Sequence, residues 1–186
     1  MCNNGVMTQG TNSADGPKRK GGFFGGLFRQ KEDSELKDNL VVFEDFIKKL
    51  KERGIELTKE MKILEIGSGK GKLLRELLKR GYNMRGIDPN PRHEGDLPIK
   101  KGNIEDADFA DETFDVVISI GVFDRSRYVQ DQGRMLEKMS KILKPGGVCL
   151  VDKEAERFMP VGRLDFIDTH ENSKIYNGFV LQKHLT

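Results

Sequence analysis

The stretch KILEIGSGKGKLLRELLKRG, residues 62–81, decides how this chain can fold. Its first five residues form a short apolar run of the kind found in buried strands. Leucines at helical spacing follow Gly71, and Gly81 predicts the end of that helix. Glycines at alternate positions lie between the two elements, which lets the backbone turn sharply and lets a ligand approach main-chain amides. The stretch therefore predicts a strand, a ligand-binding loop and a helix.

The rest of the chain alternates strands and helices in the same way. Apolar residues recur at helical spacing from Leu36 to Leu50, and Gly54 predicts the end of that helix. Further patterns predict strands at 82–88, 97–102, 114–120 and 148–151, a helix at 129–143 and a tight turn at 144–147. The last two strands, at 163–168 and 178–185, have no helix between them and should pair antiparallel. We expect an α/β fold with a doubly wound, mostly parallel seven-stranded sheet that ends in an antiparallel hairpin.

Length and composition indicate one ordinary domain. The chain has 186 residues, of which 36% are hydrophobic and 33% are charged, and no apolar run approaches the roughly 18 residues that span a bilayer. Its formal charge of +2 lacks the basic excess that nucleic-acid binding usually leaves, so nucleic acid is not indicated. Cys2 and Cys149 can supply neither a disulfide framework nor a cysteine-based metal site. We therefore expect no metal and a reducing, cytoplasmic setting.

Residues 1–33 differ from the rest of the chain. They are rich in Gly, Asn and Lys and lack periodicity, so we predict a disordered basic, Gly-rich tail before a domain over 34–186. The tail has no apolar segment typical of a signal peptide. Within it, PKRKGGFFGGLFRQK at 17–31 interleaves basic and aromatic residues, which could rest on an anionic membrane or single-stranded nucleic acid, or fold back onto the domain. Its four glycines argue against a stable helix.

Spacing separates three interpretations of the glycine loop. A phosphate-binding P-loop needs Ser or Thr after its Gly-Lys pair, but Leu73 follows Lys72 here, so that interpretation fails. The dinucleotide fingerprint needs Gly or Ala at position 72, where Lys72 weakens it. The third pattern is ExGxGxG, with Glu65 two residues before Gly67. An acid, Asp88, also ends the second predicted strand, where it could accept hydrogen bonds from both hydroxyls of a ribose.

These residues closely resemble the first motifs of the class I, Rossmann-like S-adenosylmethionine-dependent methyltransferases, and the sequence looks like their type 11 methyltransferase domain. GNIEDADFADETFDVVIS at 102–119 resembles the third and fourth motifs of that family, and MLEKMSKILKPGGVCLV at 135–151 resembles its later helix, turn and fifth strand. The resemblance runs from Leu36 to the C-terminus. It implies a single Rossmann-like domain, S-adenosyl-L-methionine as cofactor, and a methyltransferase activity.

The resemblance also assigns roles to residues of this sequence. The glycine loop would hold the methionine end, Glu65 would orient that loop, and Asp88 would bind the ribose. Adenine would lie on residues 103–105, and the segment after the fourth strand would form the floor near the sulfonium. The implied cofactor contacts are Glu65, Gly67, Ser68, Gly69, Gly71, Asp88, Asn103, Ile104, Glu105, Ser119 and Gly121.

The link between Asp88 and Asn103 departs from the family pattern. The family inserts a helix there, whereas this link is short and contains Pro89, Pro91 and Pro98, which discourage one. One face of the sheet should then be thinly covered. A parallel sheet usually buries both faces, so an oligomer or partner surface becomes more plausible, and a homo-oligomer is one candidate.

Methyl transfer from a sulfonium is a direct displacement, so aligning the acceptor can supply much of the catalysis. If a base is needed, Asp124, Tyr128, Glu154 and His170 follow the later strands. The segment SIGV at 119–122 differs from the Asn/Asp-Pro-Pro-Tyr type associated with exocyclic amino acceptors, so a small molecule is favoured over nucleic acid. A catalytically inactive module that binds S-adenosylmethionine or regulates a partner is the alternative. An NAD-dependent dehydrogenase is disfavoured because Lys72 breaks its fingerprint and no substrate domain follows.

Overall fold

The structure, a computed structural model, describes residues 24–93, 95–123, 132–159, 162–172 and 176–185. These residues contain a seven-stranded sheet with the order β3-β2-β1-β4-β5-β7-β6. Its strands are β1 (Lys62–Ile66), β2 (Asn83–Asp88), β3 (Ile99–Lys101), β4 (Phe114–Ser119), β5 (Leu143–Asp152), β6 (Leu164–Asn172) and β7 (Tyr176–Lys183). The helices are α1 (Phe24–Glu52), α2 (Lys72–Lys79), α3 (Gln132–Ile142) and the 3-10 helix η1 (Lys153–Phe158).

The strand pairing confirms the predicted fold class. Strands β1 to β5 pair in parallel, whereas β7 pairs antiparallel with both β5 and β6, so the C-terminal hairpin completes one edge of the sheet. The hairpin follows from sequence, since two strand-like stretches without a helix between them can reach the same sheet edge only by reversing direction.

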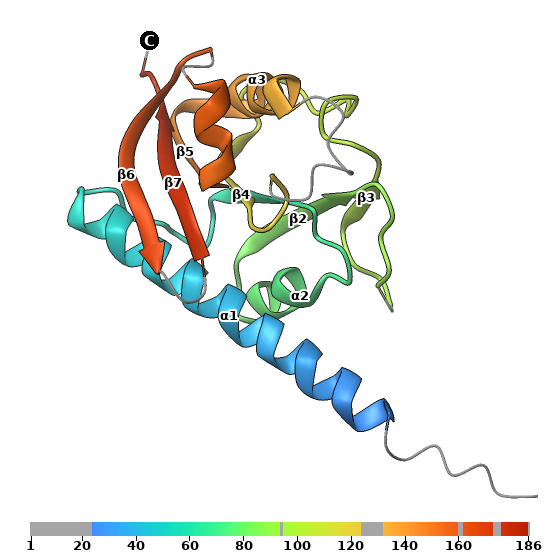
Figure 1. Cartoon of the computed structure of the whole chain (residues 1–186). Helices are drawn as coiled ribbons and strands as arrows, with labels where there is room; N and C mark the ends of the chain where they lie inside the picture. Colours follow the sequence, from blue (N-terminus) through green and yellow to red (C-terminus); the bar gives the residue numbers. More distant parts are fainter. Residues whose placement is uncertain (1–23, 94, 124–131, 160–161, 173–175, 186) are drawn as a thin grey trace, which may run out of the picture.

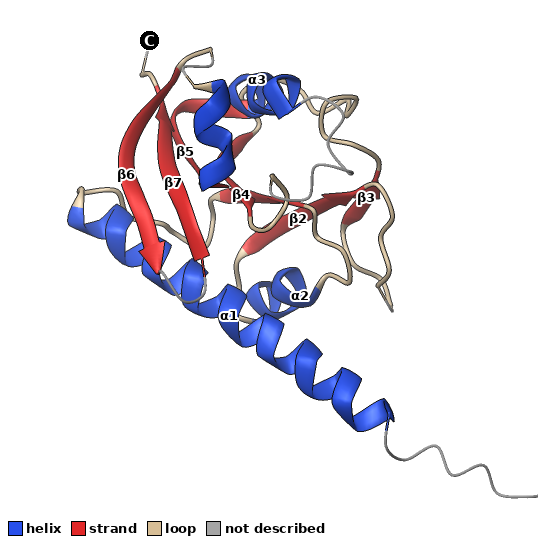
Figure 2. Cartoon of the chain, in the orientation of Figure 1, coloured by secondary structure: helices blue, strands red, loops and turns tan. Residues whose placement is uncertain are grey.

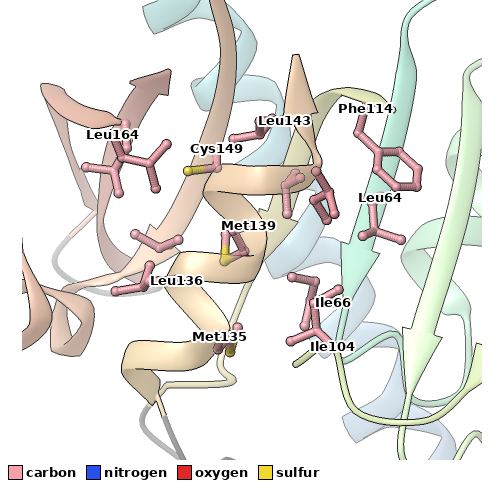
Figure 3. Packing of buried hydrophobic residues seen from close by; sticks show 14 of the residues in the cluster. Leu64, Ile66, Ile104, Phe114, Met135, Leu136, Met139, Leu143, Cys149 and Leu164 are labelled. Atoms are coloured by element: carbon pink, nitrogen blue, oxygen red, sulfur yellow. The ribbon is translucent and has the colours of Figure 1, made fainter. Parts of the chain in front are cut away.

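Helices cover both faces of the sheet, as a doubly wound fold requires (Figures 1 and 2). On one face, α1 and α2 pack over residues such as Ile63, Val116 and Leu150, and all three of these side chains are fully or almost fully buried. On the other face, Met135 and Met139 of α3 meet the opposite side of the same strands (Figure 3). The alternation of strand side chains between two apolar layers explains why these strands read as continuous apolar runs.

Helix α1 begins earlier than the sequence predicted. It starts at Phe24, so it crosses the boundary at residue 34 and includes part of the basic, aromatic segment, although that segment contains Gly25 and Gly26. A helix anchored by packed turns near Phe46 extends without a new nucleation step, so only the propensity cost of those glycines has to be offset. Figure 1 shows this first part of α1 projecting beyond α2. The rest of the segment, residues 17–23, lies outside the described residues.

One local prediction after α3 needs correction, and one short element after β5 was not predicted. The turn predicted at 144–147 lies within β5, which begins at Leu143, and the pairing of β4 with β5 shifts register between Phe114 and Val116. Gly146 has a φ of 76°, so the chain turns there without leaving the sheet. The 3-10 helix η1 was not predicted, because six residues of mixed polarity carry no clear period.

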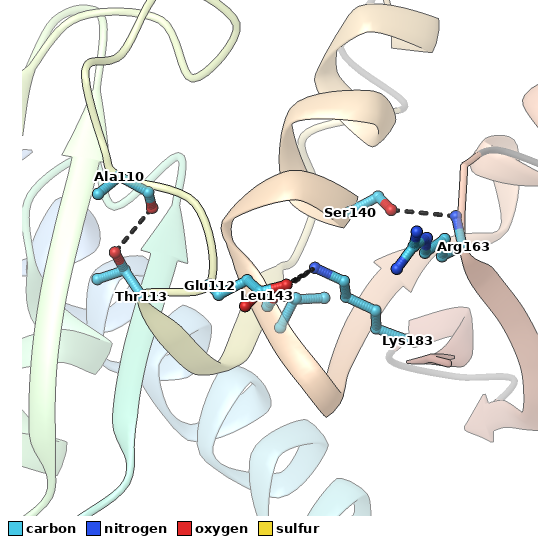
Figure 4. Close-up of polar contacts among 7 residues, drawn as sticks. All are labelled: Ala110, Glu112, Thr113, Ser140, Leu143, Arg163 and Lys183. Carbon is cyan, nitrogen blue, oxygen red and sulfur yellow. Dashed lines mark hydrogen bonds and ion pairs between the residues drawn. The ribbon is translucent and has the colours of Figure 1, made fainter. Parts of the chain in front are cut away.

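Buried and partly buried hydrogen bonds join the C-terminal hairpin to the end of α3 and to the amino ends of β4 and β5 (Figure 4). The ammonium of Lys183, whose residue is only 5% exposed, donates to the carbonyl oxygen of Leu143 over 2.6 Å and to Glu112 over 3.5 Å. The backbone N–H of Arg163 donates to the hydroxyl of Ser140 over 3.2 Å. A buried lysine is tolerated here because its charge has acceptors.

The link from β2 to β3 contains no helix among its described residues, 89–93 and 95–98. On the face of the sheet that such a helix would cover, the side chains of Asn83, Arg85 and Lys100 are exposed and polar. Polar side chains therefore occupy positions that a covered sheet would fill with apolar ones. The thin cover predicted from the sequence is thus present, although this face is polar, and a homo-oligomer stays a prediction.

Candidate cofactor site

The glycine loop joins β1 to α2 through three left-handed residues. Gly67, Gly69 and Gly71 have φ values of 74°, 50° and 66°, which side-chain-bearing residues rarely adopt. A Cβ on Gly69 would meet only the Gly67 carbonyl oxygen, at 3.9 Å, so the missing side chain leaves open space. A Cβ on Gly71 would lie 2.6 Å from Leu97, so that glycine serves packing.

Asp88 holds this loop from the end of β2. One carboxylate oxygen accepts the N–H of Gly69 over 2.8 Å, and the other accepts the N–H of Asn90 over 2.7 Å. The carbonyl of Gly69 in turn accepts the N–H of Arg92 over 2.9 Å. Since a carboxylate oxygen can accept more than one hydrogen bond, Asp88 retains capacity for ligand hydroxyls.

Glu65 lies beneath the loop and is 8% exposed. Burial raises the pKa of its carboxyl to about 8, a hydrogen bond from the Leu74 backbone partly opposes that rise, and the charge of Asp88 adds to it. Its Oε2 atom has no hydrogen-bond partner, and the buried hydroxyl of Ser68 also has none. Buried polar atoms in this condition are costly unless a ligand or water satisfies them.

These residues surround a pocket of about 360 Å³ at the carboxyl ends of β1, β2 and β4. Its volume falls within the usual range for small-molecule and cofactor sites, on the order of 300–1,000 Å³. The position is where parallel α/β sheets bind ligands, beside the point where the strand order reverses around β1. Helix α1 contributes Leu36 and Asn39 to the wall.

The structure brings most of the predicted cofactor residues to this pocket. The residues on its wall are Glu65, Gly67, Ser68, Gly69, Asp88, Asn103, Ile104, Glu105 and Gly121. Gly71 and Ser119 are buried and do not form part of the wall. The floor after β4 instead comes from Ile120, Gly121 and Val122.

The four predicted base candidates are more scattered. Asp124 and Tyr128 lie outside the described residues. Glu154 is in η1 and does not line the pocket. His170 is in β6, where its backbone lies opposite Gly178 of β7.

Sequence reasoning missed several residues around the pocket, among them two of α1 and one acid behind the floor. Leu36 and Asn39 were interpreted only as parts of an amphipathic helix, and no local motif marks them. Asp152 was also missed, although it follows a buried strand just as Asp88 does. An acid at the carboxyl end of a parallel strand is therefore the signal that could have found it.

The comparisons with known proteins decide the family. A family model described as a methyltransferase domain matches residues 36–174. The chain belongs to this methyltransferase family. The ubiquinone biosynthesis O-methyltransferase of Azorhizobium caulinodans is 30% identical over 110 residues, which cover 53% of this chain and 42% of that relative. The chain thus matches about two fifths of the length of this curated methyltransferase.

Solved methyltransferases share the fold at low sequence identity. The 1,6-didemethyltoxoflavin-N1-methyltransferase of Burkholderia thailandensis, solved with S-adenosylhomocysteine, is 14% identical, has a TM-score of 0.55, and the match covers 92% of this chain and 93% of that one. A SAM-dependent methyltransferase of Methanosarcina mazei is 17% identical, with a TM-score of 0.53 and coverage of 70% and 95%. Among the described residues of the present methyltransferase-family chain, no helix is long and apolar enough to cross a membrane.

The cofactor of this methyltransferase family, S-adenosylmethionine, suits the residues present. The unpartnered atoms of Glu65 and Ser68 can bind polar groups of the ligand. Main-chain atoms around Gly69 are accessible because no side chain covers them. Asp88 supplies a carboxylate that can accept from two neighbouring hydroxyls. The pocket therefore fits the cofactor that the family implies.

Proposed function

We propose that this chain is an S-adenosylmethionine-dependent methyltransferase that transfers a methyl group to an acceptor by direct displacement. The observation that carries the proposal is the pairing of the glycine loop with Asp88. The carboxylate fixes the loop through Gly69 and stands in the pocket wall at the carboxyl end of β2. Family membership supports the same activity.

In this proposal each part of the wall binds a different part of the cofactor. Asp88 accepts the ribose hydroxyls, and residues Asn103, Ile104 and Glu105 hold the adenine. Glu65 and Ser68 bind the methionine end, where a cationic amino group would favour the ionised form of Glu65. Gly121 lies at the floor beside the reacting group.

S-adenosylmethionine supplies a methyl group on a good leaving group. The chain then has to align an acceptor behind that methyl at about 3–3.5 Å and exclude water from the reacting atoms. This task requires position more than acid–base chemistry. Glu154 and His170 stay as predicted bases for an acceptor that must lose a proton, and Asp124 and Tyr128 stay as further candidates.

The acceptor that we favour is a small molecule. The segment SIGV after β4 supports this choice, since it lacks the Asn/Asp-Pro-Pro-Tyr type of sequence. The relative from Azorhizobium caulinodans, named for O-methylation in ubiquinone biosynthesis, is compatible with it. A cytoplasmic location and a homo-oligomer are further predictions of the sequence, and the absence of a disulfide framework supports the first.

Calorimetric titration of the purified chain with S-adenosylmethionine, NAD and ATP tests the proposal. We expect micromolar binding of S-adenosylmethionine alone, and binding at least tenfold weaker in Asp88→Ala. Failure to bind S-adenosylmethionine would overturn the proposed function. Binding without methyl transfer to any small-molecule panel, followed with a radiolabelled methyl group, would favour the inactive binding module instead.

A further inference from the structure

A second buried carboxylate holds the other side of the pocket. Asp152 ends β5 and is 4% exposed. One of its oxygens accepts the N–H of Gly121 over 2.7 Å, and the other accepts the N–H groups of Val122 and Phe123, each over 2.8 Å. Three successive amides thus converge on one carboxylate, which fixes the backbone of the loop after β4.

This loop forms the pocket floor. Gly121 and Val122 line the pocket, whereas Asp152 does not touch it. A Cβ on Gly67 would lie 2.5 Å from a methyl group of Val122, so the Val122 side chain packs closely against the glycine loop. The position of Val122 therefore sets the distance between the two loops that enclose the ligand.

Tyr176 of β7 completes the cluster. Its hydroxyl donates to the carbonyl oxygen of Ser119 over 3.4 Å and also bonds with Asp152. Burial first, and then the negative charge of Asp152, hold the pKa of this phenol well above its ordinary value. The neutral phenol is thus a hydrogen-bond donor that links the C-terminal hairpin to the end of β4.

We propose that Asp152 is a positioning residue of the cofactor pocket, which sets the floor at Gly121 and Val122 through three backbone hydrogen bonds and is supported by Tyr176. This inference rests on the proposed function, because the ligand is taken to be the methyl donor. Asp152 acts on the site through the loop and makes no contact with the ligand. Two acids at parallel strand ends then have matching tasks: Asp88 fixes the glycine loop, and Asp152 fixes the opposite loop.

The decisive variant is Asp152→Asn. Its side-chain amide keeps one acceptor oxygen and replaces the other with an NH₂ donor. That donor would face either the N–H of Gly121 or the N–H groups of Val122 and Phe123. We expect affinity for S-adenosylhomocysteine, measured by calorimetry, to fall about tenfold. We also expect the amides of Gly121, Val122 and Phe123 to exchange hydrogen faster by NMR, since they lose a charged acceptor. Tyr176→Phe keeps all three amide bonds but removes the hydroxyl that supports Asp152, so we expect a smaller loss of affinity than in Asp152→Asn, about threefold.

Asp115→Asn is the matched control. Asp115 also accepts a backbone N–H, from Lys62 over 2.8 Å, and an ammonium, from Lys144 over 2.7 Å, but it lies at the amino end of β4. This variant should lose stability while its affinity for S-adenosylhomocysteine stays within about twofold of the unsubstituted chain. An equal loss of affinity in both variants would overturn the proposal, because general destabilisation would then explain it.

Two further outcomes are distinguishable. If the unsubstituted chain does not bind S-adenosylhomocysteine, the proposed function fails. If it binds and Asp152→Asn binds equally well, only the role of Asp152 fails.

Should Asp152→Asn not fold, Val122→Ala replaces it as the test. This variant keeps the three backbone hydrogen bonds to Asp152 and removes the side chain that those bonds position. We expect about fivefold weaker binding in Val122→Ala, and unchanged affinity would overturn the proposal.

Discussion

At the carboxyl ends of the parallel strands, Glu65 and Ser68 have buried polar atoms without partners and border a pocket. At the amino ends of the same strands, the polar side chains have partners. Asp115 accepts hydrogen bonds from the backbone of Lys62 and the ammonium of Lys144, and Lys183 donates to the carbonyl of Leu143. The polar atoms at the carboxyl ends are therefore available to a ligand, whereas those at the amino ends stabilise the fold. Substitutions at the two ends should therefore separate binding from stability.

The largest effect should come from Gly69→Val. A branched side chain would enter the open space beside the loop, so we expect affinity for S-adenosylmethionine to fall at least about a hundredfold by calorimetry. The left-handed backbone should also cost about 1–2 kcal/mol of unfolding free energy in urea. Gly146→Val, at the other end of the sheet, is the control: it has a φ of 76° and should lose stability without losing affinity. Binding retained by Gly69→Val would remove the loop from the site.

Glu65 should make the stability of the ligand-free chain depend on pH. Its pKa is raised to about 8 from an ordinary 4.5, so between these values the unfolded chain is ionised while the folded chain keeps the proton. The contribution is fully present below pH 4.5 and is lost as pH rises to about 8, at a slope of at most about 1.4 kcal/mol per unit. Urea unfolding of Glu65→Gln should give a flatter profile. Identical profiles for both chains would contradict a buried, protonated Glu65.

Asp88→Ala should weaken binding of S-adenosylmethionine by roughly 1.5–3 kcal/mol, the scale for hydrogen bonds to a charged group. Part of this loss comes from the ribose hydroxyls and part from the loop, because Asp88 also accepts the N–H of Gly69. Adenosine and 2′-deoxyadenosine separate the two parts by calorimetry: only the unsubstituted chain should discriminate between them. Equal discrimination by both chains would exclude a ribose contact from Asp88.

Lys183→Met should have the smallest effect on binding and a clear effect on stability. The methionine keeps most of the buried stem but leaves the carbonyl of Leu143 without its donor, which should cost about 1–3 kcal/mol of unfolding free energy. Affinity for S-adenosylmethionine should stay within about twofold. A large loss of affinity would show that the two ends of the sheet are coupled.

The sequence predicted the fold and one half of the site because both depend on local patterns. The run KILEI, the glycines after it and Asp88 lie within one βαβ unit, so spacing alone places them together. The other half depends on contacts across the chain. Asp152 reaches the loop at 121–123 about thirty residues away, and Asn39 reaches the wall from α1, and neither contact leaves a periodic trace. Ser119 was predicted at the floor, whereas its side chain is fully buried and it does not line the pocket.

An NMR titration of the amide-labelled chain with S-adenosylhomocysteine tests the contrast between the two ends of the sheet most directly. We predict shifts in the amides of Gly67, Gly69 and Gly121, which lie in the pocket wall, and no shift at Asp115 or Lys183. Shifts confined to the amino ends of the strands, or no shifts at any concentration up to the millimolar range, would contradict the account.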